Sequence, residues 1–92
     1  MRGERLYYNE NGTLLNGSFI FYDEKGNIDR EGFCKEGKPE GELRIYDDSG
    51  ALVTVVLFEN GKANGELLNY KDGKVRSKEF YRNGKFIEEI KP

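Results

Sequence analysis

The sequence predicts an all-β fold: a single-layer, twisted antiparallel β-meander built from about 3.5 hairpin repeats of about 24 residues. Three observations predict it. Glycines and tyrosines recur along the chain with a period of 24 residues. The segments between them are about eight residues long, rich in β-branched and aromatic types, and without a helical period. The chain has 92 residues with 12 glycines but only two prolines, which indicates many tight turns.

The period is visible in four separate columns of residues. Two columns repeat with spacings of 24 and 24, and the other two with spacings of 24 and 23. Four columns that share one period indicate a repeat architecture, in which each unit packs against its neighbours. The columns are Tyr22, Tyr46 and Tyr70; Gly17, Gly41 and Gly65; Gly37, Gly61 and Gly84; and Gly26, Gly50 and Gly73.

Each unit contains two turns. The first turn is Asn-Gly in three places and Glu36-Gly37 in the fourth, and Asn-Gly favours the type I′ hairpin because both central residues need positive φ. The second turn is Asp23–Gly26 in the first copy, Asp47–Gly50 in the second and a shorter Lys71–Gly73 in the third. The three Asn-Gly turns are Asn11-Gly12, Asn60-Gly61 and Asn83-Gly84.

These turns delimit the predicted strands. Gly17, Gly41 and Gly65 fall inside strands, where glycine often marks a bend or a close approach, and we expect a neighbouring aromatic ring over each. An alternative is that the strands close into a small barrel, since open sheet edges invite unwanted pairing. The expected strands lie near residues 4–10, 13–22, 27–35, 38–46, 51–59, 62–70, 74–82 and 85–90.

One stretch of the third unit resembles a known family. The segment 60–66, Asn-Gly-Lys-Ala-Asn-Gly-Glu, followed by Tyr70 and Gly73, resembles the MORN repeat in its bacterial variant form. The resemblance extends from about Tyr7 to Phe86. It implies one elongated, twisted antiparallel sheet over residues 1–92, with repeats at approximately 7–32, 33–56 and 57–79 and a half repeat at 80–92.

The same resemblance implies a function without catalysis. Eukaryotic MORN proteins are described as scaffolds and some as phosphoinositide binders, and some bacterial members as antitoxins. We therefore expect a non-enzymatic protein-interaction or scaffold module. One alternative is an antitoxin-like component of a bacterial toxin–antitoxin pair, and another is a phosphoinositide or membrane-surface adaptor. The eukaryotic motif commonly carries a histidine near its second glycine, and this chain has no histidine.

Composition argues against several other functions. General acid–base catalysis most often uses histidine, and Cys34, the single cysteine, has no such partner, so we expect no catalytic residue. One cysteine without histidine also gives no zinc site, and Asp23–Asp29 lacks the ligand pattern of a calcium loop. We expect no metal and no cofactor.

Charge and chain ends indicate the surroundings of the protein. A net charge of −2 predicts no nucleic-acid partner and gives no attraction to anionic membranes. A single cysteine suits a reducing compartment, and the residues after Met1 form no signal peptide, so we expect a cytoplasmic protein. A signal peptide could be missing if the sequence is an excised fragment.

The repeats differ in the charge of one strand, and this predicts an interaction face. Aligned positions are acidic in the first copy, apolar in the second and basic in the third. A twofold homodimer would place acidic and basic ends opposite each other; the alternative is that a curled sheet covers this face with its own aromatics. The predicted face comprises Asp29, Glu31, Val53, Val55, Leu57, Arg76 and Lys78. A column of Tyr22, Tyr46 and Tyr70 is expected to pack along the sheet or to line a groove.

Overall fold

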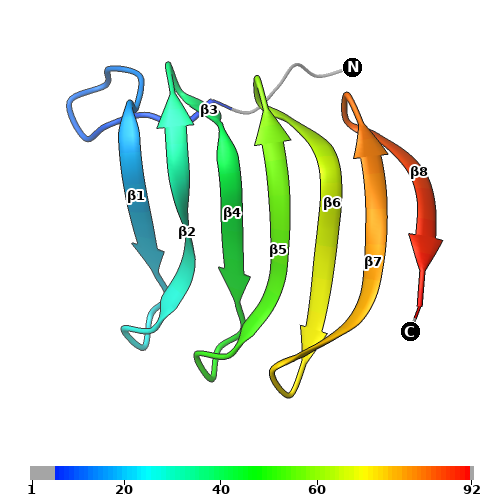
Figure 1. Ribbon diagram of the computed structural model, residues 1–92. Coiled ribbons are helices and arrows are strands. Elements are labelled where there is room, and N and C mark those ends of the chain that lie inside the picture. The colour runs from blue at the N-terminus through cyan, green and yellow to red at the C-terminus, as the bar shows by residue number, and fades with distance from the viewer. Residues whose placement is uncertain (1–5, 92) are drawn as a thin grey trace.

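The computed structural model describes residues 6–91 and confirms the predicted all-β meander. Eight strands form one antiparallel sheet in the order β1-β2-β4-β5-β6-β7-β8, and the short β3 pairs with β2 (Figure 1). The strands are β1 (Gly17–Tyr22), β2 (Ile28–Lys35), β3 (Lys38–Pro39), β4 (Gly41–Tyr46), β5 (Leu52–Glu59), β6 (Lys62–Lys71), β7 (Lys74–Arg82) and β8 (Lys85–Ile90).

The sheet is open, so the barrel alternative is wrong. Strands β1 and β8 stand at opposite ends of the strand order and pair only with β2 and β7. The molecule measures 44 × 33 × 23 Å along its principal axes. Within residues 6–91, no helix is long and apolar enough to cross a membrane.

The upper turns in Figure 1 have the expected type I′ backbone. Glu36 has φ of 51° and Gly37 of 80°, and Asn60-Gly61 and Asn83-Gly84 have matching pairs of positive values. The sequence prediction fails at Asn11-Gly12. There Gly12 alone is in the positive region, with φ of 90°. This loop connects no paired strands, since its only ladder contact is the isolated bridge between Tyr8 and Leu14.

The lower turns come in two forms, as the spacing predicted. The third copy turns tightly at Asp72-Gly73, where both residues have positive φ. The second copy has a longer loop organised by Asp47, whose Oδ1 accepts hydrogen bonds from the Ser49 backbone N–H at 2.9 Å and the Ala51 N–H at 3.0 Å. The hydrogen bond from the Ser49 hydroxyl contributes most to a lowered pKa of the Asp47 carboxyl.

The glycine column has a backbone reason: all three glycines have positive φ. Gly17, Gly41 and Gly65 have φ of 114°, 83° and 107°, a region that L-residues rarely adopt. Nothing lies within 4 Å of a Cβ built on Gly17 or Gly41, and Gly65 faces Leu57 at 3.5 Å. The expected aromatic ring over each glycine is therefore wrong. Gly32, outside the column, does lie under a ring, with Phe19 Cζ 3.3 Å from its would-be Cβ.

A second repeated feature is a hydrogen bond that joins each upper turn to the hairpin before it. The side chain before each column glycine accepts a hydrogen bond from the first backbone N–H of the next turn. Asn64 Oδ1 accepts from the Asn83 N–H at 2.9 Å. The same contact joins Asn16 to Glu36 at 2.7 Å and Glu40 to Asn60 at 3.0 Å. We call these three contacts the straps, and they satisfy turn donors that would otherwise need water.

The N-terminal segment departs from the prediction of a strand at 4–10. Residues 4 and 5 lie outside the described residues, and residues 6–10 join no ladder beyond the isolated bridge at Tyr8. Instead the Tyr7 N–H donates to the Gly37 carbonyl at 2.7 Å, and the Leu15 N–H donates to the Tyr7 carbonyl at 3.0 Å. The predicted strand 13–22 accordingly shortens to β1. The predicted strand 38–46 is divided at Glu40, whose N–H donates to Phe33.

The buried core lies on one face of the sheet, which we call the core face. Its centre is a cluster of four buried side chains: Phe19, Cys34, Leu43 and Val56. Tyr7 packs on this cluster, with its ring stacked 5.4 Å from that of Phe19. Because the sheet has a single layer, the N-terminal segment supplies part of the cover that a second layer would give.

Candidate functional site

The opposite side of the sheet, which we call the outer face, is defined by strand register. Cross-strand pairing connects one residue of each long strand into a continuous row. The row runs Ile20, Glu31, Arg44, Val55, Leu68, Lys78 and Ile90. Paired residues point to the same side of a sheet. This row therefore carries both apolar and charged side chains across the whole width of the outer face, with an apolar pair, Val55 and Leu68, in its middle part.

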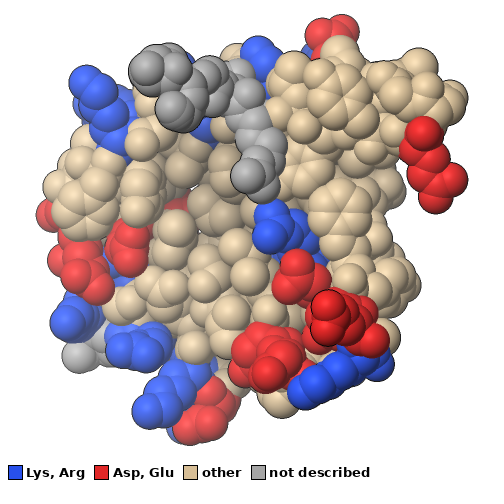
Figure 2. Space-filling view, turned by 180° about the vertical axis from the view of Figure 1, so that it is seen from behind, with Lys and Arg blue, Asp and Glu red and all other residues tan. Residues whose placement is uncertain are grey.

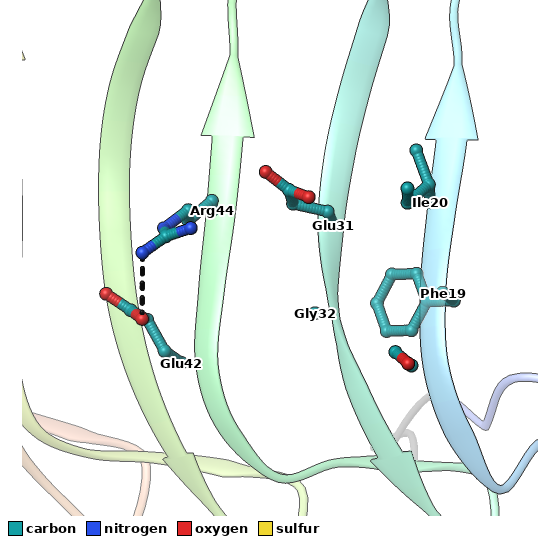
Figure 3. Close-up of a pocket in the computed structure, with 7 residues that line it drawn as sticks. Phe19, Ile20, Glu31, Gly32, Glu42 and Arg44 are labelled. Atoms are coloured by element: carbon teal, nitrogen blue, oxygen red, sulfur yellow. Dashed lines mark hydrogen bonds and ion pairs between the residues drawn. The ribbon is translucent and has the colours of Figure 1, made fainter.

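Charged groups on the outer face are mostly held within the chain. Arg44 and Glu42 form an ion pair at 3.4 Å, and Glu31 lies beside Arg44 on the neighbouring strand (Figure 3). Glu31 also accepts a short hydrogen bond from the Tyr46 hydroxyl, which raises the pKa of that hydroxyl. Towards the other end of the sheet, Lys78 lies 3.8 Å from Glu66.

Large apolar side chains on the outer face remain exposed. Tyr22 is 62% exposed, Phe33 48% and Leu57 41%. Ile20 and Ile90, at the two ends of the row, are 46% and 48% exposed. Exposed apolar groups are ordinary when single, but a set that shares one face marks a contact surface.

The residues of the predicted interaction face divide between the two sides of the sheet. Glu31, Val55 and Lys78 belong to the row on the outer face, and Leu57 lies two residues from Val55 on β5. Val55 is only 6% exposed, because its neighbours on β4 and β6 already cover it. Of the apolar residues predicted on β5, Leu57 is therefore the one that offers open surface.

A bulge separates the other three predicted residues from this row. The ladder skips one residue in β2, β5 and β7, and the skipped residues are Asp29, Val53 and Arg76. Their 24-residue and 23-residue spacings show that the bulge belongs to the repeat. The rule that residues two apart share a face fails across a bulge.

The bulge residues lie near polar groups of the core face. Val53 and Arg76 line a shallow hollow together with Thr54 and Ser77. Asp29 forms an ion pair with Arg30 at 3.6 Å, and the Arg30 guanidinium donates to the Tyr7 hydroxyl at 3.2 Å. Register also pairs Arg30 with Ile45 of the core face.

The tyrosine column is not a stack of rings. Ring contacts in the described part of the chain involve Tyr7 with Phe19 and Phe21, Phe19 with Phe21, and Tyr81 with Phe86. In the predicted column, Tyr22 is exposed, whereas Tyr46 and Tyr70 are half-buried.

Sequence reasoning missed a polar ladder on the core face. The Thr54 hydroxyl donates to Asn69 Oδ1 at 3.2 Å, and Asn69 Nδ2 donates to Ser77 Oγ and to Glu79 Oε2, each at 3.2 Å. Glu79 also accepts from the Tyr81 hydroxyl at 2.8 Å, which raises the pKa of that hydroxyl. One feature of the sequence could have predicted this ladder: a polar residue within an otherwise apolar strand, such as Thr54 between two valines.

In this ladder the hydrogen-bond partner of the Ser77 hydroxyl is an amide and not a base. Ser77 is 5% exposed and accepts a hydrogen bond from an amide, which cannot remove its proton. Cys34 is fully buried in the core cluster, and burial raises the pKa of its thiol. Residues 6–91 contain no group of three or more His, Cys, Asp or Glu that could hold a metal ion.

Charged groups of both signs lie at the lower end of the sheet. Figure 2, seen from behind, shows red and blue side chains beside each other there. The turn residues involved are Asp23, Glu24 and Asp48, which line a shallow depression with Lys25. The lower end is thus a rim of mixed charge, and the outer face remains the broad surface with exposed apolar groups.

Comparisons with known proteins add no family assignment. A scan against protein-family models, a search of curated proteins and a search of solved structures each found no match.

Proposed function

We propose that this chain is a non-enzymatic protein-interaction module, a scaffold of the MORN-repeat type, and that its outer face is the contact surface. The observation that carries the proposal is the set of exposed Tyr22, Phe33 and Leu57 side chains on a face that also bears ordered charges. Aromatic residues are enriched in the buried core of protein interfaces and among the residues that dominate the binding energy, and surrounding charges improve specificity.

The backbone supports this role because it keeps the surface rigid. Type I′ turns fix the strand register, and the straps hold each upper turn against its neighbour. A preordered surface loses little conformational entropy on binding, so its contacts translate more fully into affinity.

Photo-crosslinking tests the proposal. A benzophenone amino acid at Phe33 should form a covalent adduct with a protein in cells of the source organism, and mass spectrometry would identify it. The same amino acid at Phe86, which is 56% exposed and paired with Tyr81 rather than on the outer face, is the matched control.

An adduct from position 33 that is absent from position 86 supports the proposal, whether the captured protein is a second copy or another chain. Capture of one dedicated, different protein would favour the antitoxin-like alternative within the interaction function. Equal labelling from both positions, or none from either, would contradict a specific outer-face interface.

A further inference from the structure

We infer that the outer face binds a second copy of this chain, in a twofold dimer whose axis runs along β5. This inference rests on the proposed function, since it names the partner of the same surface. It follows from one topological fact: β5 is the middle of the seven long strands, with β1, β2 and β4 on one side and β6, β7 and β8 on the other.

A twofold axis along the middle strand places matching positions opposite each other. Each strand on one side of β5 then faces, in the second copy, the strand at the same distance on the other side of β5. β4 faces β6, β2 faces β7, and β1 faces β8. Each cross-strand row of one copy therefore lies opposite the same row of the second copy, with the order of the strands reversed. Reading a row forwards and backwards gives the residues that face each other.

The row through Val55 is complementary under this reversal. Glu31 on β2 faces Lys78 on β7 of the second copy, so each dimer contains two opposite-charge contacts. Ile20 on β1 faces Ile90 on β8, and both side chains are about half exposed in the single chain. At the next position inwards, the aliphatic stem of Arg44 faces a leucine.

The row near the lower turns matches as well. Leu52 lies on the axis and faces its own copy, and Tyr46 on β4 faces Tyr70 on β6. Further out, Ile28 on β2 faces Val75 on β7. All three contacts join apolar or aromatic groups, which suits a buried part of an interface.

The row near the upper turns is mixed. Phe33 faces Phe80, but Glu42 on β4 faces Glu66 on β6. Each of these carboxylates already has a cation in its own chain, Arg44 at 3.4 Å and Lys78 at 3.8 Å. This row weakens the dimer, because the proposed register places two carboxylates opposite each other.

The surface is large enough for this partner. A stable interface buries about 800 Å² per partner, and the molecule extends 44 × 33 Å along its two longer axes. Two sheets pack face to face with their strands nearly aligned, as this axis requires. The N-terminal segment occupies the core face through Tyr7, which leaves the outer face for the second copy.

A charge exchange tests the contact between Glu31 and Lys78. Within one chain these residues lie four strand steps apart, roughly 19 Å at the usual strand spacing, so they cannot touch each other. Glu31→Lys alone or Lys78→Glu alone places like charges opposite each other and should weaken dimerisation about tenfold. The double exchange should restore the affinity of the parent chain, as measured by sedimentation equilibrium.

A second pair of variants separates dimerisation from folding. Leu57→Lys puts like charges at the axis, yet the new amine lies opposite Glu42 in its own sheet, so the fold is retained. Phe86→Lys is the matched control away from the outer face. We expect Leu57→Lys to be monomeric and Phe86→Lys to dimerise like the parent, with equal circular dichroism.

Two outcomes would overturn the dimer. One is a parent chain that is monomeric at high micromolar concentration, and the other is a double exchange that dimerises no better than either single variant. If the parent is monomeric while a crosslinker at Phe33 still captures another protein, the dimer fails and the proposed interaction function stands. If neither a dimer nor an adduct forms, both fail.

Discussion

Replacing Gly41 tests whether the repeat depends on a left-handed backbone position. Gly41 has φ of 83°, and nothing lies within 4 Å of an added Cβ, so a larger side chain there meets backbone strain and no steric clash. An L-residue in this region costs about 1–2 kcal/mol. Gly41→Ala should therefore lower the free energy of unfolding by that amount, and Gly41→Val by somewhat more because valine is β-branched.

Thermal melts followed by circular dichroism measure the effect. For a domain of this size, about 1 kcal/mol corresponds to a shift in Tm of about 4–8 °C, so Gly41→Ala should lower Tm by about 4–16 °C. Gly65→Val should behave similarly, since its φ is 107°. The comparison variant is Gly32→Ala, where φ is ordinary but the new Cβ would lie 2.9 Å from Leu43 Cδ1.

Gly32→Ala should also destabilise the fold, by about 1–3 kcal/mol through overpacking. Shortening Leu43 to alanine should remove most of the additional penalty at position 32, because the clashing Cδ1 is lost. The same Leu43 change should leave the penalty of Gly41→Ala untouched. A Tm for Gly41→Ala equal to that of the parent would refute the strain argument.

Three further changes test the turns, the core and the pH response. Asn64→Ala removes the strap acceptor of the Asn83 N–H and should cost about 0.5–1.5 kcal/mol in urea unfolding, with no change in m-value; an unchanged midpoint would show that the straps do not stabilise the turns. Cys34→Ser should leave partner binding intact while lowering stability by about 1–3 kcal/mol, because it buries a hydroxyl in an apolar cluster; loss of binding with the fold preserved would contradict a purely structural Cys34. The raised pKa of Tyr46 means that the folded chain holds this proton more tightly than the unfolded chain. The hydrogen bond to Glu31 therefore stabilises the fold below the ordinary tyrosine pKa of about 10, and this stabilisation is lost as pH rises through the higher folded value. Tyr46→Phe should make unfolding less sensitive to pH in that alkaline range, and an unchanged alkaline slope would remove this assignment.

The sequence predicts the turns and strand order well because local chemistry determines them. Asn60-Gly61 and Asn83-Gly84 favour the type I′ turn through their backbone preference, and the repeat places both between consecutive strands. Because such turns connect consecutive strands and set their register, each long strand pairs with the next long strand along the chain. Strands 74–82 and 85–90 accordingly have the predicted bounds.

The failures occur where a non-local contact decides the structure. Residues 6–10 have the composition of a strand, yet Tyr7 bonds to Gly37 and packs on Phe19 instead of joining a ladder. The period of 24 residues therefore could not predict that this segment packs over the core cluster. The predicted strand 38–46 is likewise divided at Glu40, where the backbone N–H bonds to the Phe33 carbonyl and the side chain forms the strap to Asn60.

The bulge explains why the candidate site was predicted only in part. An extra residue that recurs in every copy leaves the period unchanged, so no spacing reveals it. Alternation therefore placed Val53 with Val55 on one face, whereas the structure puts Val53 beside Thr54 in the hollow of the core face. The charge relation between Glu31 and Lys78 survives because both residues lie on the same side of their bulges.

Distances between spin labels test the twofold dimer most directly. Single labels at Asp48→Cys, in the turn before β5, and at Lys25→Cys, in the turn between β1 and β2, lie at different distances from the proposed axis. The native Cys34 is fully buried and can remain in place.

With sheets about 10 Å apart and strands about 4.8 Å apart, the two copies of position 48 should be separated by roughly 11 Å, and those of position 25 by roughly 26 Å, before the label arms are added. Pulsed electron double resonance at high protein concentration should therefore give a short distance for position 48 and a clearly longer one for position 25. No intermolecular coupling at either position, or a shorter distance at position 25, would contradict a dimer formed through the outer face around β5.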